Sequence, residues 1–142
     1  MARQEKIVVD ASVVFKWYVT ERWTEEALQI VDDYQKGHID IASVALMPFE
    51  VLNALRYAPG TSLIDLLTVA ESIEKLCIDL RQLDGELGKR TMENALRYGI
   101  TIYDSSYLSL GELEEADVYT ADEKLISRAK ESCLKNISSY SR

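Results

Sequence analysis

The feature that most constrains the fold of this chain is a short apolar run that ends in an aspartate and leads into a helical pattern. Ile7-Val8-Val9-Asp10 is one such run, and Val118-Tyr119-Thr120-Ala121-Asp122 is another. Residues 100–103 lead to Asp104 in the same way. Strands that alternate with helices are typical of a parallel sheet with helices packed on both faces. The sequence therefore predicts an α/β fold with a central parallel β-sheet of four to five strands.

The rest of the chain continues this alternation. Apolar spacing, capping residues and Gly or Pro stops predict helices over about 11–18, 24–36, 48–58, 62–75, 84–98, 105–114 and 123–131. Strands are predicted at 7–10, 39–42, 76–80, 100–103 and 117–120, with a weaker edge strand at 134–138. Because no linker, repeat or low-complexity tract interrupts the pattern, we expect residues 1–142 to form a single domain.

Four acidic residues are expected to meet at one edge of this sheet. Asp10, Asp104 and Asp122 each follow a predicted strand, and Glu50 lies in the first turn of the helix that Pro48 opens. The carboxyl ends of parallel strands line one crevice, so these side chains converge there. Each acid alone is better explained as a helix cap or a first-turn charge. Together they indicate a metal site, because clustered carboxylates repel one another unless a cation neutralises them.

The residue types indicate which metal and which chemistry this site would serve. Hard divalent cations such as Mg²⁺ and Mn²⁺ prefer oxygen ligands, and a carboxylate site with no nearby His or Cys favours phosphate chemistry. The single histidine, His38, lies far from the acids in the sequence and is interpreted as structural. The hydroxyls of Ser12 and Thr120 could support the metal site or simply bond to the local backbone.

Two other α/β enzyme plans fit this pattern less well. A phosphatase with an aspartyl nucleophile is expected to carry Asp-x-Asp after its first strand, but the third position here is Ser12. A receiver domain needs an acidic pair after the first strand and an acceptor aspartate after the middle one. Asp10 stands alone and the predicted middle strand has no terminal aspartate.

Composition and charge restrict the function further. The net charge of −8 argues against holding nucleic acid by bulk electrostatics, although it does not exclude an enzyme whose acids bind metal. Cys77 and Cys133 lack metal-site spacing and lie among apolar residues, so both are expected to be buried thiols. With neither a signal-peptide pattern nor a membrane-spanning run, we expect a cytoplasmic protein with no membrane partner.

Several segments resemble the PIN domain, and most closely the VapC toxins of toxin–antitoxin pairs. The likeness is carried by residues 7–12, 15–17, 50–55, 103–107 and 119–125, and it extends over about 6–138. It implies a Mg²⁺- or Mn²⁺-dependent endoribonuclease whose metal-binding acids are Asp10, Glu50, Asp104 and Asp122, supported by Thr120 and Ser12. It also implies a homodimer, an RNA substrate and a VapB-type antitoxin gripped by the helices at 50–55 and 62–75.

Some assignments stay open at this stage. Contacts to RNA could come from a few basic side chains, chosen by position only: Lys16, Arg56, Lys89, Arg90, Arg97 and Lys124. The aromatic residues Trp17, Tyr18, Trp23 and Tyr107 are expected in the core or at a dimer contact rather than stacked on bases. The alternatives to the toxin are an inactive PIN scaffold that binds a protein partner and a PIN nuclease that acts in RNA maturation or on DNA.

Overall fold

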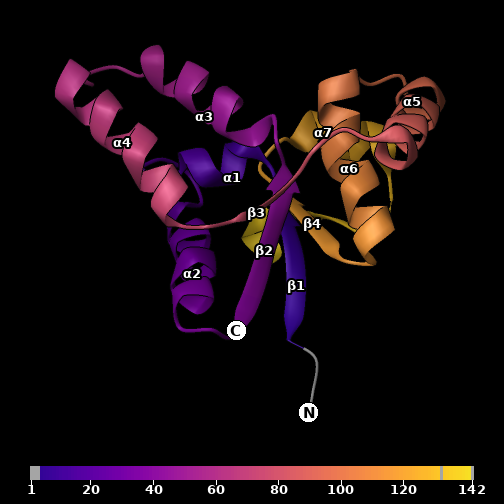
Figure 1. Cartoon of the computed structure of the whole chain (residues 1–142), viewed down its shortest axis with the longest axis horizontal. Coiled ribbons are helices and arrows are strands. Elements are labelled where there is room, and N and C mark those ends of the chain that lie inside the picture. The colour runs from indigo at the N-terminus through magenta and orange to yellow at the C-terminus, as the bar shows by residue number, and fades with distance from the viewer. Residues whose placement is uncertain (1–3, 132, 142) are drawn as a thin grey trace.

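The protein is built on a parallel sheet with the strand order β3-β2-β1-β4-β5 (Figure 1). The computed structural model describes residues 4–131 and 133–141. The strands are β1 (Glu5–Val9), β2 (Ile39–Val44), β3 (Asp79–Arg81), β4 (Asp117–Thr120) and β5 (Leu134–Asn136). Every neighbouring pair is parallel, which confirms the predicted sheet of four to five strands.

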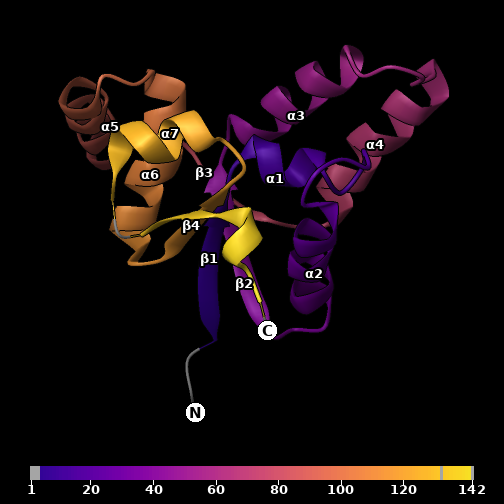
Figure 2. The same ribbon diagram turned by 180° about the vertical axis from the view of Figure 1, so that it is seen from behind.

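Helices cover the sheet on both sides, also as predicted. They are α1 (Ala11–Phe15), α2 (Thr24–Gln35), α3 (Met47–Arg56), α4 (Leu63–Lys75), α5 (Gly85–Tyr98), α6 (Ile102–Glu114) and α7 (Glu123–Ala129), followed by a 3₁₀ turn, η1 (Ile137–Ser139). Figures 1 and 2 show α1 to α4 on one side and α5 to α7 on the other. Helices α3 and α4 form an arm that extends beyond the carboxyl ends of the strands.

The core is centred on β1, the middle strand. Ile7, Val8 and Val9 are almost fully buried because helices cover both faces of this strand. Leu108 and Leu110 of α6 are buried in the same core. The strand that ends in Asp10 is therefore buried on both faces in the core, and this packing positions its carboxyl end.

The predicted strand at residues 100–103 is wrong. Helix α5 ends at Gly99, which has a positive φ of 64°, and α6 already begins at Ile102. The Thr101 hydroxyl caps α6 by accepting a hydrogen bond from the Asp104 backbone N–H at 3.0 Å. Only residues 99–101 lie between the two helices, which is too short a segment for a strand that crosses the sheet. Asp104 is consequently a first-turn helix residue and not a strand-end aspartate.

Other differences lie at the ends of elements. Strand β3 begins at Asp79, and α1 ends at Phe15. The expectation that both cysteines are buried is also wrong for Cys77, which is exposed just after α4 with φ of 53°. Cys133 is partly buried, and this burial raises the pKa of its thiol to about 11.

Helix α6 packs unusually close to β4. A Cβ atom added at Gly111 would lie 2.1 Å from Val118 Cγ2 and 3.1 Å from the Ala116 carbonyl oxygen. Only a residue without a side chain permits this approach. Within the described residues, no helix is both long and apolar enough to cross a membrane.

Candidate functional site

Asp10 occupies the point where β1 ends and α1 begins. Its carboxylate caps α1, since Oδ1 accepts hydrogen bonds from the backbone N–H groups of Ser12 at 3.0 Å and Val13 at 3.3 Å. The Ser12 hydroxyl donates a third bond to the same oxygen at 2.5 Å. Asp10 is only 6% exposed. The cap and the candidate ligand are thus one residue, and the two explanations offered by the sequence are compatible.

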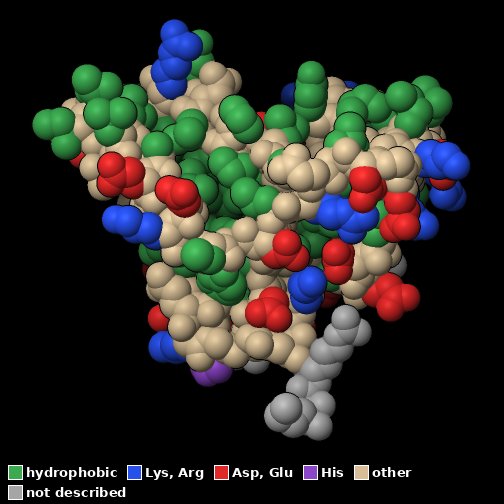
Figure 3. Space-filling model, viewed as in Figure 1, with side chains coloured by type: hydrophobic (Ala, Val, Ile, Leu, Met, Phe, Trp, Pro, Cys, Tyr) green, Lys and Arg blue, Asp and Glu red, His purple; other side chains and the backbone are tan. Residues whose placement is uncertain are grey.

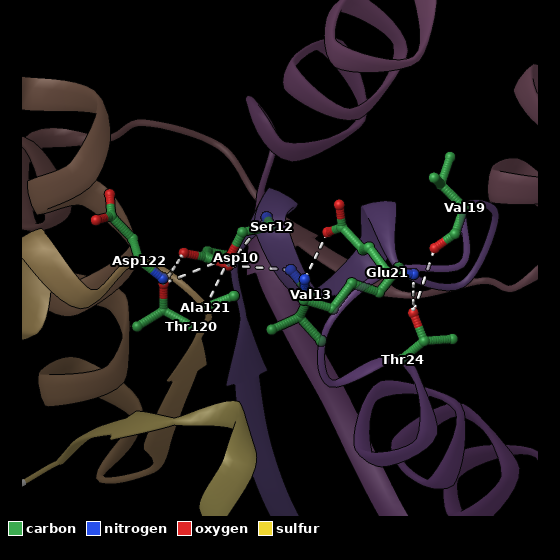
Figure 4. Close-up of polar contacts among 10 residues, drawn as sticks. Asp10, Ser12, Val13, Val19, Glu21, Thr24, Thr120, Ala121 and Asp122 are labelled. Carbon is green, nitrogen blue, oxygen red and sulfur yellow. Dashed lines mark hydrogen bonds and ion pairs between the residues drawn. The ribbon is translucent and has the colours of Figure 1, made fainter. Parts of the chain in front are cut away.

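The end of β4 lies beside Asp10 and is joined to it by hydroxyl groups. Thr120 is fully buried; its hydroxyl donates to Asp10 Oδ2 and accepts a bond from the Asp122 backbone N–H at 3.0 Å. Ser12 Oγ accepts a bond from the Ala121 N–H at 2.9 Å. Figure 4 shows these residues together at the carboxyl ends of β1 and β4. Ser12 and Thr120 therefore support the acids and also bond to the local backbone.

Asp122 combines the same two roles on the next helix. Its Oδ1 caps α7 by accepting bonds from the Lys124 N–H at 3.0 Å and the Leu125 N–H at 3.1 Å. Its charge acts on both Asp10 and Asp104. Asp122 is therefore close enough to influence two of the other three predicted acids.

The electrostatics of this cluster favour a bound cation. Burial raises the pKa of Asp10 from 3.8 to about 6, and the charge of Asp122 adds to the effect, while the bonds from Ser12, Thr120 and Val13 oppose it. Burial and the Asp122 charge also raise the pKa of Asp104. A positive ion at this edge would relieve both effects.

Glu50 reaches the site from the first turn of α3, as predicted. Its Oε1 accepts a hydrogen bond at 2.5 Å from the hydroxyl of Tyr107, which is buried on α6. The pKa of Tyr107 is raised by burial, by this bond and by the charges of Glu50 and Asp10. Tyr107 thus links Glu50 to the acids at the strand ends.

Sequence reasoning did not assign this role to Tyr107. The available signal was its position three residues after Asp104, because residues at that spacing share one face of a helix.

The donor set suits a hard divalent cation, although the side chains are not drawn together around one point. Among the described residues, no three His, Cys, Asp or Glu side chains form a ready-made metal-binding group. In the same part of the chain, Asp122 Oδ2 and Glu50 Oε2 accept no protein hydrogen bond. These oxygens are available as ligands for Mg²⁺ or Mn²⁺, which would also stabilise the buried, ionised form of Asp10.

The remaining predicted residues lie in several places. Lys16 is 5% exposed and forms an ion pair with Glu21 at 2.5 Å, and His38 lies 3.7 Å from Asp33 Oδ1. Arg90 pairs with Glu112 at 3.9 Å. As expected, four aromatic residues pack in or against the core: Trp17, Tyr18, Trp23 and Tyr107.

Known proteins resemble this chain in sequence and in fold. No protein-family model matches the sequence. Ribonuclease VapC3 of Pyrobaculum aerophilum is 30% identical over 128 residues, which cover 87% of this chain and 94% of that protein. The chain belongs to the VapC-type PIN-domain family.

Solved structures of other proteins share the fold of this VapC-type chain at low sequence identity. A toxin–antitoxin complex from Klebsiella pneumoniae aligns with a TM-score of 0.64 and 13% identity, over 85% of this chain and 90% of that one. PAE2754 from Pyrobaculum aerophilum aligns with a TM-score of 0.65 and 20% identity, over 95% of this chain and 92% of that one. FitAcB from Neisseria gonorrhoeae aligns with a TM-score of 0.63 and 14% identity, over 87% of this chain and 93% of that one.

Proposed function

We propose that this VapC-type protein is a Mg²⁺- or Mn²⁺-dependent endoribonuclease. The observation that carries the proposal is the buried Asp10 carboxylate at the carboxyl edge of the sheet, because burial and the nearby charge of Asp122 raise the pKa of Asp10 to about 6. A site that keeps a carboxylate in this state without an opposite charge is destabilised, which favours a cation as its ligand. The name of the 30% identical relative, a ribonuclease, supports RNA as substrate.

The residues divide the work as follows. Asp10, Asp104 and Asp122 would hold the cation, with Glu50 completing the set or orienting the attacking water. When bound, the cation would lower the pKa of a water molecule and neutralise the phosphate charge. Ser12 and Thr120 fix the orientation of Asp10, and Tyr107 fixes that of Glu50. In the hydrolysis, water attacks the phosphorus and the 3′ oxygen leaves.

The biological setting we propose is the toxin of a toxin–antitoxin pair with a VapB-like antitoxin. A fold neighbour is described as a toxin–antitoxin complex. The arm of α3 and α4 carries five large apolar side chains that are more than half exposed: Phe49, Tyr57, Leu63, Ile64 and Leu67. Figure 3 shows apolar atoms gathered over this arm. With a net charge of −8, the protein suits a basic partner with apolar anchors.

A homodimer is the further assembly we propose. A mainly apolar cavity of about 340 Å³ lies between α3, α5 and α6, bordered by the exposed Phe49, Leu83 and Tyr103. Phe49 precedes Glu50 and Tyr103 precedes Asp104 in the sequence. A second copy seated here would therefore bring two acid clusters near one groove. Sedimentation equilibrium of the wild type and Leu83→Ser tests this assembly.

Cleavage of a mixed small-RNA pool by purified protein tests the enzyme. The reactions contain Mn²⁺, Mg²⁺ or chelator, with Asp122→Asn run beside the wild type. Asparagine still caps a helix, so this variant keeps the start of α7 and removes only the charge. Metal-dependent cutting that is lost in Asp122→Asn supports the proposal. A folded, antitoxin-free protein that cuts none of the pool would favour the scaffold or a narrow substrate of RNA maturation.

A further inference from the structure

Arg22 is a basic residue beside the acid cluster that the proposed chemistry does not use. It lies in the loop between α1 and α2, and its side chain is 73% exposed. Arg22 Nη1 is 3.6 Å from Glu123 Oε1, and Glu123 directly follows Asp122. A guanidinium is therefore located at the rim of the acids, on a protein whose net charge of −8 repels anions over most of its surface.

The loop holds this guanidinium in a defined place. Its carbon atom Cζ lies 4.0 Å from the centre of the Trp23 ring, a stacked cation–π contact. Trp23 packs against the core and has a positive φ of 67°. The Thr24 hydroxyl accepts the Glu21 N–H at 2.9 Å and bonds to the Val19 carbonyl at 3.3 Å, as Figure 4 shows. Arg22 is thus presented on an ordered turn.

The bond to Glu123 is easy to exchange. Both side chains are mostly exposed, and exposed ion pairs contribute little to stability. A phosphate oxygen could replace the carboxylate while Trp23 keeps the guanidinium in position. Arginine also suits a phosphate better than lysine, because its planar fork can donate two parallel bonds.

A second basic side chain, that of Arg128, lies on α7, the helix that begins with Glu123. Arg128 is exposed in the last turn of α7, and its charge favours the ionised form of Asp104. Glu123 and Arg128 are five positions apart, a rise of about 7.5 Å along a helix. Arg22 and Arg128 therefore stand near opposite ends of α7, one close to Asp122 and the other close to Asp104.

We propose that Arg22 binds a backbone phosphate of a single-stranded RNA at the rim of the acid site, with Arg128 contacting a second phosphate along α7. This inference deepens the proposed ribonuclease function and rests on it for the identity of the strand. The contact is independent of base sequence, since phosphates position a strand and do not specify it. The sequence pattern favours other basic residues, because only the fold places residue 22 beside residue 123.

The first test measures binding without cleavage. A fluorescently labelled single-stranded RNA of mixed sequence is titrated with full-length protein in chelator, over about 20 to 200 mM salt. The matched control is Arg90→Gln, which removes the same charge from another arginine–glutamate pair, that of Arg90 and Glu112 at 3.9 Å. The sequence made Arg90 a candidate for RNA contact by position only. In the structure it lines a different cavity, with Asp117 at the opposite end of β4 from Thr120, and it is therefore excluded from the proposed contacts.

We expect Arg22→Gln to weaken binding about fivefold, the scale of one exposed charge contact. The slope of log affinity against log salt should fall by about 0.7, the value for one phosphate contact on a single strand. Arg128→Gln should act in the same direction, Arg22→Lys should keep the slope, and Arg90→Gln should match the wild type. Equal losses for Arg22→Gln and Arg90→Gln, or no measurable wild-type binding, would overturn the inference.

A second readout separates this inference from the proposed function. In Mn²⁺-dependent cleavage, Arg22→Gln should raise KM and leave kcat unchanged, because its ion pair is with Glu123 and not with any of the four proposed metal-binding acids. Cleavage with an unchanged KM would refute the role of Arg22 and leave the nuclease standing. Arg22-dependent binding without any metal-dependent cleavage would refute the nuclease and keep the phosphate contact.

Discussion

The two halves of the candidate site are built in different ways. The strand-borne half consists of Asp10, Ser12, Thr120 and Asp122 at the ends of β1 and β4, and a continuous set of hydrogen bonds joins its members. The helix-borne half consists of Glu50, Asp104 and Tyr107 on α3 and α6. Glu50 and Tyr107 share one bond, and Asp104 is half-buried near the Thr101 cap.

This difference teaches how much of the site the backbone alone can fix. The register between β1 and β4 determines the strand-borne half, so its geometry is complete as soon as the sheet forms. The helix-borne half depends on how two helices pack against the sheet. We therefore expect substitutions in the strand-borne half to change the free energy of unfolding, and those in the helix-borne half to change activity with little effect on stability.

The largest expected effect on stability is that of Asp10→Asn, and it is stabilising. The native state binds a proton more tightly than the unfolded chain, since the pKa of Asp10 is about 6 instead of 3.8. Wild-type stability consequently falls as the pH rises through this window. In chelator at pH 7, Asp10→Asn should be more stable by up to about 3 kcal/mol and should lack activity.

Urea unfolding at several pH values measures this effect. The advantage of Asp10→Asn should vanish below about pH 4, where the wild-type carboxyl is protonated in both states. Asp40→Asn, an exposed aspartate of β2, is the control and should show no such advantage. Equal stability of Asp10→Asn and wild type at pH 7 would show that the buried charge is not a source of strain.

The next effect is that of Thr120→Val, which destabilises. It removes the hydroxyl that donates to Asp10 and that accepts the Asp122 N–H. Loss of a buried hydrogen-bonding group costs ~1–3 kcal/mol, and loss of a group that orients a metal ligand reduces activity about 10–100-fold. Thermal unfolding and cleavage rates check both values, with the exposed Thr68→Val as control.

A smaller change in stability is expected for Tyr107→Phe, in the helix-borne half. The partly exposed Glu50 can replace the lost bond with water, so the cost should be about 1 kcal/mol. Cleavage should fall about tenfold, because Glu50 is no longer oriented. Tyr34→Phe removes a comparable bond, from the Tyr34 hydroxyl to the Leu76 carbonyl at 2.8 Å, and should leave the rate unchanged. Equal rates for both variants would contradict the positioning role of Tyr107.

The smallest effect on stability is expected for Asp104→Asn. The hydrogen bond from the backbone N–H of residue 104 to the Thr101 hydroxyl is kept in this variant, and the Asp104 side chain is only half-buried. Its free energy of unfolding should stay within about 0.5 kcal/mol of the wild type, although metal-dependent cleavage should be lost. Full cleavage by Asp104→Asn would remove this residue from the proposed metal ligands.

Local sequence patterns correctly predict the strand that carries Asp10, but they predict a strand before Asp104 where the structure has the start of α6. The run 7–10 predicts a buried strand that ends in a carboxylate, because hydrophobicity and capping are local properties. The run 100–103 has the same appearance, but Gly99 ends one helix and Thr101 caps the next, so no strand fits between them.

Contacts between distant segments were also beyond the reach of local patterns. Tyr107 meets Glu50 across 57 positions of the chain, and Arg22 meets Glu123 across 101 positions. The prediction for Cys77 fails for a related reason: Ile78 beside it is buried, whereas Cys77 itself is exposed at a positive-φ position after α4.

The close approach at Gly111 has a consequence for how this protein can be inactivated. A single methyl group at Gly111 would push α6 away from β4, and the displacement would be carried along the helix to Tyr107 and Asp104. The spacing between the two halves would then change while every acid remained in the sequence. A genetic screen for variants that have lost toxicity should accordingly recover Gly111→Ala as well as substitutions of the acids. In Gly111→Ala the acids are unchanged, and activity is lost because their spacing is altered.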